Sequence, residues 1–104
     1  YLAKKAHDHG SRIYGATIMP CGNTEYSEKW MQAFEKTRRD VNQWIRTQSV
    51  YDGYFDFDEI LKNDTVPAYL KEEVHIGDGL HPNTMGGKIL AECVDLSMLT
   101  GLDD

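Results

Sequence analysis

The chain of 104 residues has little of three features that each indicate a class of protein. Its two cysteines, Cys21 and Cys93, are too few for a disulfide framework or a cysteine-based metal site. No apolar run approaches the ~20 residues that a membrane-spanning helix requires. No basic cluster occurs, and the formal net charge of -6 argues against nucleic acid or an anionic membrane as a partner. What remains is an ordinary globular composition, with 40% hydrophobic and 27% charged residues.

Hydrophobic periodicity and turn residues predict helices and strands in alternation. We expect the end of a helix over residues 1–9, a buried strand over 12–19 and a long amphipathic helix capped by Ser27. A short strand over 54–57 and a final helix from about Thr84 to Thr100 follow. The apolar face of that final helix is formed by Met85, Ile89, Cys93 and Leu96.

Strands that alternate with helices are typical of βαβ units. The sequence therefore predicts an α/β fold with a parallel sheet covered on both faces. Two strands make a poor sheet, because a parallel pair leaves two edges unpaired. The chain also begins with Tyr1 and not with an initiator Met. We therefore expect residues 1–104 to be the C-terminal portion of a single larger α/β domain.

The long helix carries an apolar stripe at steps of four and seven residues, which predicts packing against the core. The stripe consists of Trp30, Phe34, Val41 and Ile45. Arg38 and Arg39 have acidic neighbours, and we expect both on the solvent-exposed face.

Two other stretches invite a metal-site interpretation. His7 and His9 are two positions apart on the first helix, so they point to different faces and are expected in solvent. Asp56 and Asp58 are expected to cap the end of the second strand, because a Ca²⁺ or Mg²⁺ site needs more oxygen ligands than this stretch offers. We therefore predict no metal site at either stretch.

The stretch "GDGLHPNTMGG", residues 77–87, places Asp78 three positions before His81. In an open α/β sheet such a loop lies at the carboxyl ends of the strands, where ligands bind. The N-terminus of the following helix favours a neutral imidazole, which a general base needs. Asp78 can reach Nδ1 of His81 and fix its tautomer. The same spacing also fits a capping Asp beside an exposed His without a catalytic role.

The segment "DGLHPNTMGGKILAE" resembles the last block of the SGNH hydrolases, or GDSL esterases, in which Asp-x-x-His-Pro supplies two triad members. "GSRIYGATIMPCGN", "RRDVNQWIR" and "YFDFDEIL" resemble earlier segments of that family in the same order. The resemblance implies a three-layer, flavodoxin-like sandwich and a serine esterase (or lipase) that hydrolyses carboxylic esters, such as acetylated carbohydrates, through an acyl-enzyme. It implies His81 as general base and then acid, Asp78 as its orienting carboxylate, a small-molecule ester substrate, and no metal or organic cofactor.

One part of the family pattern is missing. The nucleophile of the family lies in a Gly-Asp-Ser block near the start of the domain, and none of the serines here follows Gly-Asp. Those serines are Ser11, Ser27, Ser49 and Ser97. Asn23 is a candidate for substrate binding, although it does not match the oxyanion Asn of the family by position. We therefore expect the missing N-terminal part of the domain to supply Ser, Gly and Asn, and the 104 residues alone to be nearly inactive.

Two alternatives stay open at this stage. A half-domain with exposed sheet edges could be a non-catalytic interaction module that forms a homodimer through those edges. An α/β-hydrolase also places Asp before His, but in loops far apart in sequence, so the spacing of Asp78 and His81 disfavours it. The sequence gives no indication of a cellular compartment.

Overall fold

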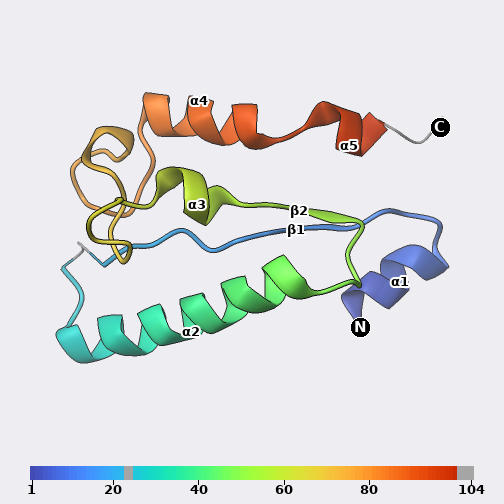
Figure 1. The fold of residues 1–104 in the computed structure, drawn as a ribbon, viewed down its shortest axis with the longest axis horizontal. Helices are drawn as coiled ribbons and strands as arrows, with labels where there is room; N and C mark the ends of the chain where they lie inside the picture. The colour runs from blue at the N-terminus through green and yellow to red at the C-terminus, as the bar shows by residue number, and fades with distance from the viewer. Residues whose placement is uncertain (23–24, 101–104) are drawn as a thin grey trace.

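The computed structural model describes residues 1–22 and 25–100 (Figure 1). The elements in chain order are α1 (Leu2–Asp8), β1 (Tyr14–Ala16), α2 (Glu28–Thr47), β2 (Gly53–Phe55), α3 (Phe57–Leu61), the 3₁₀ turn η1 (Glu72–Val74), α4 (Thr84–Cys93) and α5 (Leu96–Thr100). The predicted mixed α/β character is confirmed.

The two strands form a parallel pair, with Tyr14 opposite Gly53 and Ala16 opposite Phe55. No further strand joins this sheet within the described part of the chain. In Figure 1 the pair lies between α2 on one side and α4 with α5 on the other. A parallel pair joined by a helical crossover is the arrangement that the sequence predicts.

Contacts on the strand residues show that both faces of the sheet are covered. Gly15 faces α2, because a Cβ built on it would lie 2.8 Å from the Tyr51 ring and 3.8 Å from Ile45 of α2. Tyr14 faces the other way and donates its hydroxyl to the main-chain oxygen of Met98 in α5 over 2.7 Å. Successive strand residues point to opposite faces, so these two contacts assign one helical layer to each face.

The centre of the core lies beyond the carboxyl ends of the strands. Leu61, Leu70 and Val74 are fully buried, and they pack with partly buried side chains that include Ile89 of α4. This cluster joins α3, η1 and α4, so it fixes the two ends of the loop over residues 75–83. That loop carries Asp78 and His81.

Ser27 caps α2 as predicted, since its Oγ accepts a hydrogen bond from Trp30 N over 3.2 Å.

The strands are shorter than predicted. Beyond Ala16, Thr17 N still donates to Phe55 O over 3.0 Å. Ile18 then pairs with the side-chain amide of Asn42, which accepts from its N–H over 2.7 Å and donates to its C=O over 2.9 Å.

The single long helix predicted at the end of the chain is wrong, because the helix breaks at Asp95. Oδ1 of Asp95 accepts from Ser97 N over 2.9 Å and from Ser97 Oγ over 2.6 Å. An Asp that binds the first amides after it starts a new helix and does not continue the old one. The predicted apolar face is therefore interrupted: Ile89 packs against the core, whereas Met85 and Leu96 are exposed.

Trp30 is not in the core, contrary to the prediction from its helical spacing. The side chain is 46% exposed, and its ring lies between those of Tyr26 and Phe34, at centroid distances of 4.4 and 5.2 Å. Ile45, at the other end of the stripe, is buried as expected. The apolar stripe thus packs on the sheet only in its C-terminal half, because the N-terminal half of α2 extends past the strands (Figure 1).

In the part of the chain that the structure describes, no helix combines the length and the apolar character that crossing a membrane requires. This agrees with the absence of a long apolar run in the sequence.

Candidate active site

Asp78 and His81 are in direct contact in the loop between η1 and α4. Asp78 Oδ2 lies 2.5 Å from His81 Nδ1. The other carboxylate oxygen accepts from the main-chain amides of Leu80 and His81, each over 2.9 Å. The contact expected from the Asp-x-x-His spacing is therefore present, while its catalytic role stays a prediction.

These hydrogen bonds hold the pKa of Asp78 well below its usual range; the bond with the His81 side chain has the largest effect, followed by the amides of His81 and Leu80. A carboxyl whose pKa is lower in the folded state stabilises that state above its unfolded pKa of about 3.9. This stabilisation is lost as the pH falls through the pKa that the carboxyl has in the folded state. At neutral pH Asp78 is therefore ionised and able to orient a histidine.

The free nitrogen of His81 is accessible. Because the ionised Asp78 carboxylate lies at Nδ1 of His81, a neutral imidazole carries its proton on Nδ1. Nε2 is then unprotonated and can act as a base. The His81 side chain is 66% exposed. Its Nε2 has no hydrogen-bond partner among residues 1–22 and 25–100. The pair is thus arranged to take a proton from a group that approaches from outside these residues.

Asn83 fixes the loop against the start of α4. Its Oδ1 caps the helix by accepting from Gly86 N over 2.8 Å, and its Nδ2 donates to the main-chain oxygen of His75 over 3.1 Å. Asn83 N also donates to Val74 O over 2.8 Å, and His75 forms an antiparallel bridge with Pro82. Both ends of the loop are therefore fastened to η1 and α4.

His75 is buried in this loop, which the sequence pattern did not predict. A signal was available: His75 lies three residues before Asp78 in a stretch with two glycines. Only the structure shows that its ring points inward.

None of the four serines hydrogen-bonds His81. Ser27 caps α2 and Ser97 binds Asp95, while Ser11 and Ser49 lie outside the loop that carries Asp78. Asn23, the candidate for substrate binding, lies outside the described residues. The assignment of the nucleophile to a segment upstream of Tyr1 stays a prediction.

A second Asp–His pair lies at the amino ends of the strands. His7 Nε2 is 2.9 Å from Asp52 Oδ2, which also accepts from Ile13 N over 2.7 Å. The pair joins α1 to the turn before β2, so it is a structural link. His7 and His9 are exposed as predicted, and no three side chains are grouped as metal ligands among the described residues.

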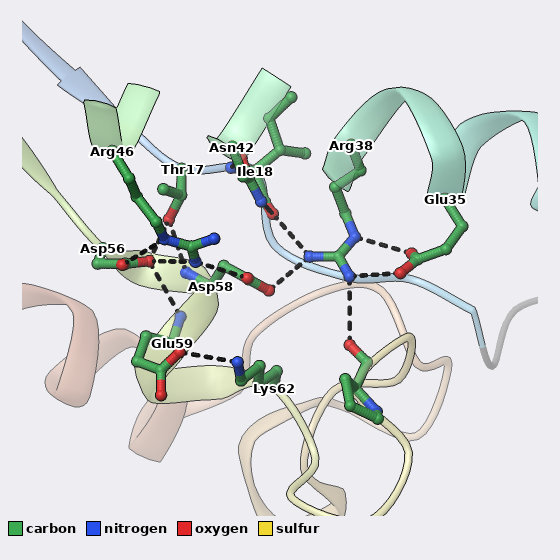
Figure 2. Close-up of polar contacts among 11 residues, drawn as sticks. Thr17, Ile18, Glu35, Arg38, Asn42, Arg46, Asp56, Asp58, Glu59 and Lys62 are labelled. Atoms are coloured by element: carbon green, nitrogen blue, oxygen red, sulfur yellow. Dashed lines mark hydrogen bonds and ion pairs between the residues drawn. The ribbon is translucent and has the colours of Figure 1, made fainter. Parts of the chain in front are cut away.

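A network of charged side chains links α2 with the residues that follow β2 (Figure 2). Arg38 Nη1 lies 2.5 Å from Asp58 Oδ1, and its other nitrogens donate to Glu35 over 2.7 and 2.8 Å. The Arg38 side chain is 3% exposed, so the expectation that Arg38 lies in solvent is wrong. One of its partners, Asp58, is 20 positions away in sequence, so the acidic residues near Arg38 in the sequence did not reveal the buried contact.

Arg46 extends the network to the start of α3. Its Nε donates to Asp56 Oδ2 over 2.7 Å, and its Nη2 donates to Asp58 Oδ2 over 2.9 Å. Arg46 is the main reason that the pKa of Asp56 is lowered. Asp56 caps α3 by accepting from Glu59 N over 3.2 Å, and Asp58 lies buried within this helix. The prediction placed both carboxylates as caps at the end of the strand, because it did not include α3. Phe57 begins a helix, whereas the sequence predicted it as the last residue of the strand.

An open groove of about 1210 Å³ runs between α2 and residues 65–69. Its walls include Arg38 and Arg46, but neither Asp78 nor His81 lines it. The pair of Asp78 and His81 therefore lies outside this groove.

No protein-family model matches the chain, and a search of curated proteins also returns no match.

Proposed function

We propose that residues 1–104 are the C-terminal part of an SGNH-type serine esterase, a three-layer flavodoxin-like sandwich that hydrolyses carboxylic esters. The upstream part of the domain carries the nucleophile. The observation that supports this most is the contact of the Asp78 carboxylate with His81 Nδ1, which leaves Nε2 exposed. An aspartate that only caps the turn would not have to orient the imidazole of His81. A histidine that acts as a general base requires such an orientation.

The proposed reaction assigns one task to each member of the pair. His81 Nε2 takes the proton of the serine hydroxyl as Oγ forms a bond to the ester carbonyl carbon. The resulting imidazolium gives that proton to the departing alcohol as the C–O bond breaks. Water then attacks the acyl-enzyme with His81 again as base, and the acid and free serine are released. Asp78 stays ionised and stabilises the imidazolium.

The open edge of β1 also supports an upstream continuation of the sheet. Ile13 O accepts from Asp52 N and Thr17 N donates to Phe55 O, so these groups point toward β2. By alternation, the main-chain groups of Tyr14 and Ala16 point away from it. No described strand pairs with that edge. A strand from the upstream part of the domain would satisfy them.

A fluorophosphonate probe tests this proposal, because it labels only activated serines. In the complete product of the gene, we expect one adduct on a serine upstream of Tyr1, located by peptide mass spectrometry. The 104-residue chain alone should stay unlabelled. His81→Ala should abolish labelling, and His7→Ala, which breaks the other Asp–His pair, should leave it unchanged. Labelling within residues 1–104, or labelling that survives His81→Ala, would contradict the proposal.

The same open edge favours a second candidate, a non-catalytic module that forms a homodimer through β1. Light scattering on the 104-residue chain is expected to give a dimer mass in that case. Ala16→Pro removes an N–H that points away from β2, so it should convert the dimer to a folded monomer. A compact wild-type monomer, or a dimer unaffected by Ala16→Pro, would exclude pairing at this edge.

A further inference from the structure

The loop that carries Asp78 is built around a buried histidine. The His75 side chain is 4% exposed. Its Nδ1 accepts hydrogen bonds from Gly77 N over 3.0 Å and from Gly79 N over 3.1 Å. These two amides flank Asp78 on either side. The imidazole therefore holds the main chain immediately before and after the carboxylate residue.

The direction of these bonds fixes the protonation of His75. Nδ1 receives two N–H donors, so it carries no proton, and the neutral ring has its proton on Nε2. Nε2 is buried and has no hydrogen-bond partner in the described chain, and Glu72 Oε2 lies 3.8 Å away. A second proton on the ring would oppose two amide protons at Nδ1. His75 thus acts as an acceptor.

The loop needs such an acceptor because its backbone is unusual. Gly77 and Gly79 have φ values of +107° and +70°, which residues with a side chain rarely adopt. Backbone of this kind persists where surrounding contacts hold it. Four amides of the loop converge on two acceptors: those of Gly77 and Gly79 on His75, and those of the two residues after Gly79 on Asp78.

We propose that His75 is a positioning residue that sets the orientation of the Asp78 carboxylate toward His81. The role in turnover rests on the proposed function of the Asp78–His81 pair, whereas the role in the loop does not. Without the acceptor at Nδ1, the amides of Gly77 and Gly79 lose their partner, and the turn at Asp78 loses its fixed form. The carboxylate then no longer meets Nδ1 of His81 in one geometry.

Two variants separate the acceptor from the bulk of the ring. His75→Leu fills similar space without an acceptor, whereas His75→Asn keeps an acceptor near the place of Nδ1. On the 104-residue chain, long-range ¹⁵N–¹H NMR should show an unprotonated Nδ1 on wild-type His75. His75→Leu should increase amide exchange of Gly77 and Gly79 at least 10-fold and raise the pKa of Asp78 in a carboxyl ¹³C titration. His75→Asn should restore both toward wild type.

Amides of α2 serve as the internal control for global folding in both variants. A protonated wild-type Nδ1 would overturn the proposal even if both variants fail to fold. Unchanged exchange and an unchanged Asp78 titration in His75→Leu would overturn it as well. In the complete protein, His75→Leu should lower kcat by about 10–100-fold, the range for residues that orient a ligating or catalytic side chain, and His75→Asn should recover it. If the complete protein proves not to be an esterase, the proposed function fails, while the NMR results still decide the role of His75 in the loop.

Discussion

Replacing His81 with alanine is expected to lower kcat for ester hydrolysis by about 10⁶-fold in the complete protein. The exposed Nε2 is the proposed acceptor of the serine proton, and alanine leaves no base in its place. Asp78→Asn keeps the shape of the side chain but offers an amide to Nδ1, so the wrong tautomer is favoured. That change is expected to cost about 10⁴-fold in kcat. In both variants KM should change little, because neither side chain is proposed to bind the ester.

Steady-state hydrolysis of a small aryl ester measures these losses. His7→Ala is the matched control, since His7 also contacts an aspartate and is also exposed, but lies at the amino ends of the strands. The double variant of His81 and Asp78 should be no worse than His81→Ala alone, because the two act as one unit. Full activity in His81→Ala, or equal losses in His81→Ala and His7→Ala, would show that the pair is not catalytic.

Replacing Arg38 with alanine is expected to lower the free energy of unfolding by about 3–5 kcal/mol. The side chains of Arg38 and Asp58 are 3% and 6% exposed, so solvent screens their contact little. Alanine leaves the Asp58 carboxylate buried with Arg46 alone and frees the carboxylate of Glu35. It also removes a donor to Ile18 O at the end of β1.

Urea unfolding of the 104-residue chain, followed by circular dichroism, measures this loss. Arg39→Ala deletes the same side chain at the next position, which is exposed and outside the network, so its effect should stay within about 0.5 kcal/mol. If Arg38→Ala were as mild as Arg39→Ala, the network would not be a principal contributor to stability.

The features that the sequence predicts well are local ones. The cap at Ser27 and the presence of a long helix after it follow from a residue type and a period that act within a few turns. The contact between Asp78 and His81 follows from a spacing of three in a glycine-rich loop. In each case the partners are close in sequence, so chain geometry alone brings them together.

The features that the sequence does not predict depend on partners that are distant or compete with each other. Arg38 is buried because Asp58, 20 positions later, is placed beneath it by the crossover from β1 to β2. The last helix breaks because the Asp95 carboxylate accepts the hydrogen bond of Ser97 N, which a continuous helix would direct to a main-chain oxygen. Trp30 obeys the helical period, but α2 is longer than the sheet that it covers, and no period reveals that. His75 looks like any polar loop residue until its ring is seen to point inward.

The side-chain amide of Asn42 has a consequence for any strand that joins β1. It imitates a peptide group, since it accepts from Ile18 N and donates to Ile18 O, and it is 1% exposed. An added strand can therefore exchange hydrogen bonds with Tyr14 and Ala16 but must diverge from β1 at Ile18. The unpaired edge of β1 that other chains could bind is thus short, which limits cross-β association as long as no strand pairs with it. A strand that pairs with Tyr14 and Ala16 would separate from the backbone of β1 at the end of the sheet where the loop of His81 lies.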